Sequence, residues 1–229
     1  MLKLIRLEWK KNNIMKYMWK ALAMVIILLL LLLTIAGELE AAETRFDYGN
    51  SMLKSGVELF TNMSFIILTC VMLASFIVGT YKNKTINLMF SYPINRKKIV
   101  LSQMLSVWIF NFIALTLSKV LIYCVLVAVK KYTFISAEGI RLGDSMFYVE
   151  VLVDSAVMIS ISFTALMVGL MMKSSKATII AGMIIVCLTQ GNIGVYTLAG
   201  NIPFYITLLM LSAVSVFLSL YKLETRDVL

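Results

Sequence analysis

The chain has 229 residues, of which 61% are hydrophobic and 14% charged, and its formal net charge is +9. A soluble domain is about 45–50% apolar and about 25% charged, so this composition excludes an ordinary soluble protein. The chain has no histidine, which excludes zinc proteases of the H-E-x-x-H type and hydrolases that use a Ser-His pair.

Most apolar residues occur in long runs. A helix of about 20 residues crosses a hydrocarbon core of about 30 Å. We therefore predict an all-α integral membrane protein that forms one transmembrane domain over residues 1–229. Six spans are expected, at residues 18–36, 60–80, 102–129, 146–172, 177–199 and 203–221.

The residues before the first span form an amphipathic pattern. Leu2, Ile5 and Trp9 fall on one side of a helix, and basic residues fall on another. The small residues at 34–37 are compatible with a cleaved signal peptide, but a long basic segment precedes the apolar run. We favour an uncleaved first span preceded by a helix at the membrane interface.

The segment 81–99, YKNKTINLMFSYPINRKKI, joins the second and third spans. Pro93 ends any helix there, because proline lacks an N–H and biases the residue before it away from helical angles. Exposed apolar residues beside fixed positive charge indicate a protein partner. The apolar residues form a patch too short to cross a bilayer: Leu88, Met89, Phe90 and Tyr92.

The Lys and Arg residues predict the orientation. Most of them fall in the N-terminal segment, the 81–99 loop, the turn at residues 173–176 and the C-terminal tail, which places both termini in the cytoplasm. The segments on the outer side are acidic and contain Glu38, Glu40, Glu43, Asp47, Glu58, Glu138 and Asp144.

Two charges fall inside the third and fourth spans, Lys119 and Asp154. A charge at the middle of a bilayer costs about 2.5–3.5 kcal/mol on insertion scales, so such residues usually pair or face water. Counted from the outer ends of their spans at the helical rise, both lie at a similar depth. We expect them to face each other, either as a structural ion pair or as a substrate contact.

Two glycines and two amide residues interrupt the fifth apolar run, at Gln190, Gly191, Asn192 and Gly194. Lipid cannot satisfy backbone groups that a broken helix frees, so such breaks lie in protein or beside water. We expect the helix to end near Gln190 and residues 192–202 to form a short re-entrant or interfacial turn, part of an outer gate. An ordinary kinked helix is the alternative.

Catalytic and metal-binding signals are nearly absent. The sequence has no G-x-x-x-x-G-K-[ST] motif, so the chain has no P-loop for ATP. Cys70, Cys124 and Cys187 fall within spans without C-x-x-C spacing, which favours packing roles over metal or disulfide roles. We expect no enzyme activity, no metal and no cofactor in this chain.

The chain resembles the permease subunits of ABC-2 type ATP-binding-cassette exporters. The resemblance rests on the N-K-T-I…S-Y-P-I-x-R-K-K-I pattern after the second span, the six-span layout, the amphipathic N-terminal helix and the interrupted fifth span. The charged tail at Lys222–Asp227 also matches. The layout covers the whole chain, whereas the residue-level match is mostly the loop. The modest first outer loop departs from the subgroup with large outer domains.

In that family the loop between spans two and three holds a coupling helix that docks on the ATPase. By resemblance, this role falls here on Thr85, Leu88, Met89, Phe90 and Tyr92. The resemblance also implies two ABC ATPase subunits that bind ATP and Mg2+, and a second permease subunit in a homo- or heterodimer. Spans two and five would flank the central route. The expected location is the bacterial cytoplasmic membrane, with lipids around the spans.

The implied function is outward movement of an amphipathic substrate, of which an antimicrobial or toxin-like peptide fits best. Lipid, polysaccharide and ion remain alternative cargoes within the family. A non-transporting membrane sensor or scaffold is the rival class. A secondary transporter would need internal repeats, and the two halves of this sequence show none. No nucleic-acid partner is expected, because no soluble domain carries a basic face.

Overall fold

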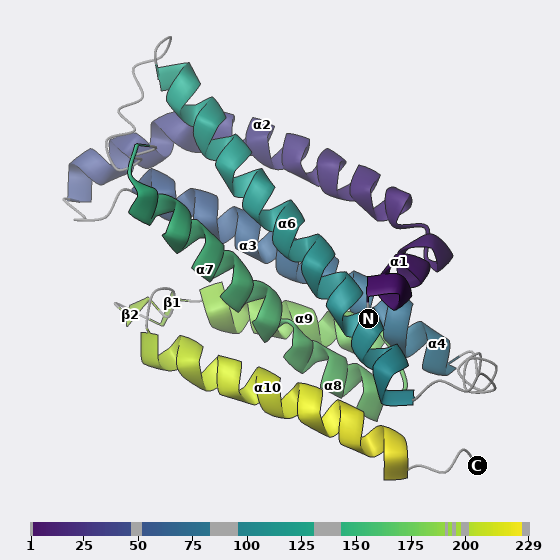
Figure 1. Ribbon diagram of the computed structural model, residues 1–229. Helices are drawn as coiled ribbons and strands as arrows, with labels where there is room; N and C mark the ends of the chain where they lie inside the picture. The colour runs from purple at the N-terminus through teal and green to yellow at the C-terminus, as the bar shows by residue number, and fades with distance from the viewer. Residues whose placement is uncertain are drawn as a thin grey trace. The chain divides into compact units, whose positions relative to one another are not determined.

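The computed structural model describes residues 2–46, 52–82, 96–130, 143–190, 192–193, 196–197 and 202–225. These residues are almost entirely helical, as the apolar runs predict (Figure 1). In chain order the elements are α1 (Leu2–Lys11), α2 (Ile14–Phe46), α3 (Met52–Leu73), the π-helical turn η1 (Ala74–Val78), α4 (Gly79–Lys82), α6 (Arg96–Lys130), α7 (Ser145–Ile161), α8 (Phe163–Met171), α9 (Ser175–Gln190), β1 (Asn192–Ile193), β2 (Tyr196–Thr197) and α10 (Ile202–Thr225).

Four helical stretches are long and apolar enough to cross a membrane. They overlap the first four predicted spans and cover Ile14–Gly37, Leu53–Val78, Lys98–Val129 and Ser145–Met171. The two remaining apolar helices are shorter within the described residues, at Ser175–Gln190 and Pro203–Ser219. The helical membrane-like character is therefore established, while the six-span layout with both termini inside remains a prediction.

The fifth apolar run does not continue as a helix to residue 199. Helix α9 ends at Gln190, and the short strands β1 and β2 pair antiparallel, with Asn192 opposite Thr197 and Ile193 opposite Tyr196. Ile, Tyr and Thr favour extended backbone, whereas glycine and asparagine weaken a helix. The interruption expected near Gln190 is thus present.

The fourth run contains a break within its length. Ser162 separates α7 from α8, and its hydroxyl donates to the carbonyl of Ile159 at 2.6 Å. Serine hydroxyls that bond back to a preceding carbonyl compete with the helical ladder and often bend a helix. The expected single helix over 146–172 is therefore two shorter helices in sequence.

The turn between α8 and α9 is built at Lys173, which has a φ of 47°. The amide of Ser174 donates to the carbonyl of Gly169 at 3.2 Å. A left-handed residue followed by this backbone bond is the Schellman end of a helix, and it satisfies a carbonyl that the helix leaves free. The chain thereby reverses within a few residues and brings α9 back against α8.

The chain divides into two compact units. Unit 1 comprises Met1–Ile14, Phe65–Asn111 and Val157–Leu229, and unit 2 comprises Met15–Ser64 and Phe112–Ala156.

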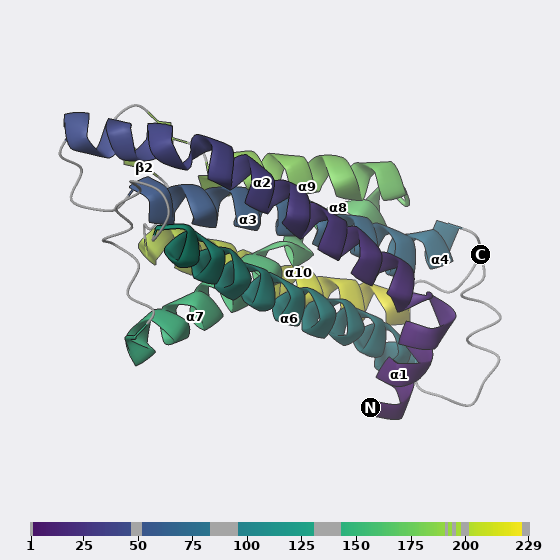
Figure 2. The same ribbon diagram turned by 90° about the horizontal axis from the view of Figure 1, so that it is seen from above.

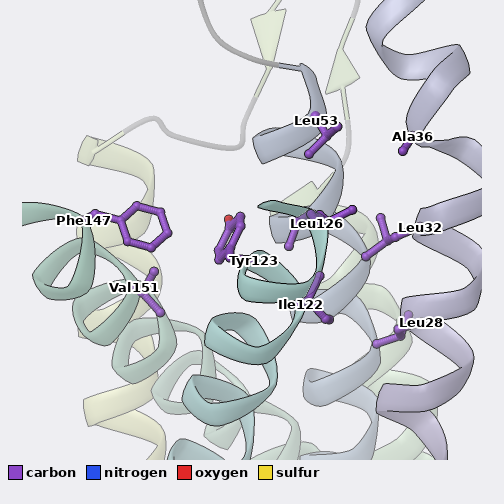
Figure 3. Close-up of a cluster of buried hydrophobic side chains, with 10 residues drawn as sticks. Leu28, Leu32, Ala36, Leu53, Ile122, Tyr123, Leu126, Phe147 and Val151 are labelled. Atoms are coloured by element: carbon purple, nitrogen blue, oxygen red, sulfur yellow. The ribbon is translucent and has the colours of Figure 1, made fainter. Parts of the chain in front are cut away.

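Unit 2 has an apolar core formed by α2, the first part of α3, α6 and α7. Figure 2 shows α2 alongside α3, and the close-up in Figure 3 shows Tyr123 between Phe147 and Leu126. The rings of Tyr123 and Phe147 meet edge to face, with centroids 5.1 Å apart. The buried members of this core are Leu28, Leu32, Ala36, Leu53, Val57, Ile122, Tyr123, Leu126, Phe147 and Val151.

Unit 1 is packed through small residues, and α8 contacts α9, α10 and η1 (Figure 1). Gly169 lies against Thr178 and Val78, and Gly182 lies against Cys70. Small residues let helix backbones approach closely, which is the usual way that helices associate where lipid surrounds them. A cavity of about 450 Å³ lies between η1 and α9 and is lined by Val71, Ala74, Ser75, Gly79, Thr80, Ser175 and Ile179.

The close contact at Gly169 predicts the effect of one added methyl group. A Cβ at this position would lie 1.9 Å from Thr178 Oγ1 and 3.2 Å from Val78 Cγ2. Overpacking costs about 1–3 kcal/mol, which offsets the gain of about 1 kcal/mol that alanine brings to a helix over glycine. We expect Gly169→Ala to lower the thermal unfolding midpoint of the purified chain in detergent.

Gly37→Ala is the matched control, because nothing lies within 4 Å of the added Cβ on α2. This variant should keep or slightly raise the unfolding midpoint. Equal effects of the two substitutions would contradict the proposed packing at Gly169.

Candidate functional site

Three helices of unit 2 each carry polar residues at four-residue spacing. On α3 these are Lys54, Glu58 and Asn62, on α6 they are Lys119 and Tyr123, and on α7 they are Glu150 and Asp154. Residues four apart lie on the same face of a helix. We name these seven residues the ionic cluster.

Lys119 and Asp154 form an ion pair between α6 and α7. The Lys119 side chain is 1% exposed and that of Asp154 is 27% exposed. The same oxygen, Asp154 Oδ2, accepts a hydrogen bond from Asn62 Nδ2 at 3.2 Å. Asp154 therefore joins all three helices, because it accepts from α3 and from α6 while it sits on α7.

A second ion pair lies in a more exposed part of the cluster. Lys54 Nζ is 2.8 Å from Glu150 Oε2, and these side chains are 25% and 57% exposed. Lys54 Nζ also lies 6.0 Å from the centroid of the Phe147 ring, within reach of a cation–π contact. Breaking this pair should cost less than breaking the buried one, since exposed ion pairs give about 0–1 kcal/mol and removal of one partner of a buried pair costs roughly 3–5 kcal/mol.

Glu58 is the third carboxylate of the cluster, and within the described residues it makes no ion pair at 4 Å or closer. It is half-buried and lies in the electrostatic field of both lysines and both other acids. The hydroxyl of Tyr123, on α6, lies close to the Glu58 carboxylate.

The sequence prediction placed Lys119 and Asp154 together from their depths, and the structure brings them together. It placed Glu58 in an outer segment, whereas Glu58 lies inside α3 and inside the candidate span Leu53–Val78. The signal that sequence reasoning missed is the four-residue spacing of Lys54, Glu58 and Asn62, which predicts one polar helix face opposite other charges.

The other predicted sites are described in part or not at all. Thr85, Leu88, Met89, Phe90 and Tyr92 lie outside the described residues, between the end of α4 and the start of α6.

At the predicted gate, Gln190 is the last residue of α9 and Asn192 begins β1, while Gly191 and Gly194 lie outside the described residues. The buried Nε2 of Gln190 has no hydrogen-bond acceptor within the described part of the chain. The structure thus places a helix end and a buried amide where the gate was predicted.

The N-terminal helix α1 is held to α6 by polar contacts. Glu8 is 7% exposed and accepts a hydrogen bond from Gln103 Nε2 at 3.3 Å and from Asn12 Nδ2 at 3.2 Å. Trp9 Nε1 donates to the carbonyl of Ser106 at 3.3 Å. A helix was expected here from its apolar face alone, but the buried face includes a carboxylate whose partners include a side chain on α6.

Comparisons with known proteins add one relative. No protein-family model matches the chain, and no solved structure matches it. The chain is 27% identical over 230 residues to "Uncharacterized protein YcbO" of Bacillus subtilis (strain 168), and the alignment covers 98% of this chain and 97% of that protein. The similarity extends along both chains, and that protein's name assigns no activity.

The ion pair of Lys119 and Asp154 generates a double-mutant prediction. Lys119→Met strands a partly buried carboxylate, and removal of one partner of a buried pair costs roughly 3–5 kcal/mol. Asp154→Leu should cost at least as much, because it strands both Lys119 and the amide of Asn62. The double variant should recover part of the loss, since it leaves no unpaired charge. Folded yield and unfolding midpoint measure the three effects.

Lys176→Met, at an exposed lysine, is the control for charge removal and should change the midpoint little. Losses that simply add in the double variant would mean that the two residues do not stabilise each other.

Proposed function

We propose that this chain is the permease subunit of an ABC exporter, without an ATPase site of its own. The observation that carries the proposal is the basic and apolar segment 81–99 between two long apolar helices. A separate ATPase, present in two copies, would dock on this segment and supply ATP and Mg2+ chemistry. The proposal includes six spans, both termini inside, and a place in the bacterial cytoplasmic membrane.

The positions of α4 and α6 support this proposal. Helix α4 ends at Lys82 and α6 begins at Arg96, so a short segment connects two candidate spans. Such a segment is long enough for a coupling helix of two or three turns and too short for a folded domain. The contacts of Glu8 and Trp9 hold α1 against the first part of α6, the helix that follows the proposed docking segment along the chain.

The cavity between η1 and α9 supports a route shared by two permease subunits. Its lining includes Ala74, Ser75, Gly79 and Thr80 of the second predicted span and Ile179 of the fifth. A π-helical turn within an α-helix is frequently found at functional sites, and η1 forms one wall of this cavity. A second permease copy facing this wall would complete a path for an amphipathic cargo, and a peptide remains the cargo class that we propose.

Paired charge substitutions in the proposed docking segment test the function. Leu88→Asp with Phe90→Asp places two carboxylates in the apolar patch, so we expect loss of a copurifying ATPase that carries a G-x-x-x-x-G-K-[ST] motif. Burying an unpaired charge costs several kcal/mol, enough to reduce the complex by at least tenfold. Copurification and stimulation of ATP hydrolysis by the membrane chain provide the two measurements.

Phe134→Asp with Ile135→Asp is the matched control, because it makes the same change in the segment predicted to lie on the other side of the membrane. This variant should keep the ATPase. If the Leu88 and Phe90 variant also keeps it, with unchanged stimulation, the docking role is wrong. If no such ATPase copurifies with the wild-type chain, the sensor or scaffold class is favoured.

The helix end at Gln190 generates a prediction for the gate. Replacing Gly191 and Gly194 by alanine adds about 1 kcal/mol of helix propensity at each position, which shifts an equilibrium between broken and continuous helix by roughly tenfold or more. We expect weaker uptake of a fluorescent amphipathic peptide into inverted vesicles, with ATPase copurification unchanged. Gly143→Ala, at a position with open space around the added Cβ, should leave transport unchanged. Normal transport by the double variant would rule out gating here.

A further inference from the structure

A groove lined by apolar side chains lies in unit 1, between the first part of α6 and the helices α8 and α10. Its volume is about 260 Å³, which is below the roughly 300–1,000 Å³ of sites for drug-sized ligands. A groove of this size and lining fits part of a flexible apolar chain better than a bulky or polar ligand. The lining residues are Leu101, Met104, Leu105, Trp108, Phe163 and Val216.

The groove has an apolar floor and a partly exposed rim. Met104 is 3% exposed and Phe163 is 7% exposed, whereas the other lining residues are half-buried. Trp108 Nε1 donates to Ser160 Oγ on α7 at 3.2 Å. The one polar group of the indole is therefore used outside the groove, and the ring offers the groove an apolar surface.

The groove follows one face of α6 toward a lysine. Leu101, Leu105 and Trp108 come three, seven and ten residues after Lys98, a spacing that places all four on one side of a helix. The rise from Leu101 to Trp108 is about 10 Å along the helix axis. A chain that lies in the groove would therefore run nearly along α6, as the acyl chains of a bilayer run along a helix that crosses it.

Lys98 stands where the groove meets the end of the candidate span. That span begins at Lys98, so the groove lies within its apolar part and the lysine lies at the level expected for lipid headgroups. Lys98 is exposed, and among the described residues it makes no ion pair. Arg96 and Lys97 precede it directly along the chain, so this end of α6 begins with three cationic residues.

We propose that this groove binds one acyl chain of an anionic phospholipid whose phosphate pairs with Lys98. The apolar lining fits the chain, and the cationic start of α6 fits a headgroup with net negative charge. A choline headgroup offers the same phosphate but brings a cation of its own, which the basic residues repel. The site is independent of the exporter function proposed above and needs only that α6 lies in a membrane.

Fluorescence quenching of Trp108 by lipids with brominated acyl chains tests the site. The chain has three tryptophans, so Trp9→Phe with Trp19→Phe leaves only the one in the groove wall. This single-tryptophan chain is placed in phosphatidylcholine nanodiscs in which a growing fraction of the lipid is brominated phosphatidylglycerol or, in a parallel series, brominated phosphatidylcholine. Half-maximal quenching should need a fraction of phosphatidylglycerol that is lower by about fivefold or more, the effect of one lysine near an anionic headgroup.

Two pairs of variants, made in the single-tryptophan chain, assign the effect to the headgroup contact and to the groove. Lys98→Gln should raise the required fraction of phosphatidylglycerol about fivefold, whereas Lys176→Gln, at an exposed lysine of α9, should keep the wild-type value. Leu105→Phe fills the groove and should lower the maximal quenching by phosphatidylglycerol. Leu117→Phe makes the same change at a position of α6 that is 64% exposed, and it should leave quenching unchanged.

Three results would overturn the proposal. Equal curves for the two lipids would show ordinary contact with the bilayer, and a preference for phosphatidylglycerol that survives Lys98→Gln unchanged would remove the assigned headgroup contact. Absence of quenching by either lipid would show that protein, such as a second copy of this chain, covers the groove. If the single-tryptophan chain does not fold, native mass spectrometry of the otherwise unchanged chain counts the phosphatidylglycerol that it retains. Equal retention by that chain and by its Lys98→Gln variant would then reject the site.

Discussion

The charge pairing inside apolar helices is the constraint that fixes unit 2. An apolar helix can turn about its axis among lipid-like neighbours at little cost, but a buried lysine must meet a carboxylate. Lys119 meets Asp154, and Asp154 also accepts from Asn62, so α3, α6 and α7 are held in one relative rotation. The apolar core around Tyr123 and Phe147 then packs between helices whose rotation these polar contacts set.

Most other buried hydroxyl groups are satisfied inside their own helices. Thr61 donates to the carbonyl of Val57 at 2.7 Å, Thr69 to that of Phe65 at 2.7 Å, and Ser155 to that of Val151 at 2.7 Å. Such local bonds remove the penalty of a buried polar group but do not choose a neighbouring helix. The specificity between helices therefore depends on the side chains that reach across, which include those of the ionic cluster, Glu8, Trp9 and Trp108.

The sequence predicts the interior of the helices better than their ends. Runs of apolar residues identify the first four spans. The predicted contact between Lys119 and Asp154 rests on their similar depths, which are counted from the outer end that the third and fourth spans share. The apolar runs predict a second span that begins at residue 60, with Lys54 and Glu58 in an outer segment. In the structure α3 begins at Met52, and the charge of Lys54 meets that of Glu150 on α7. Hydropathy alone does not contain this partner.

Helix α6 carries residues that contact α1 and residues of the ionic cluster, and it directly follows the 81–99 segment along the chain. It is 35 residues long, and it carries Gln103 and Ser106 for α1 and Lys119 and Tyr123 for the ionic cluster. Hydrogen bonds and ion pairs are directional, so a rotation of α6 breaks them, whereas apolar contacts tolerate small shifts. If the 81–99 segment docks on an ATPase, as we propose, then α6 is the helix that follows it directly along the chain. A change at the docking segment would then act on a helix whose rotation is resisted, within each unit, by polar contacts to its own neighbours.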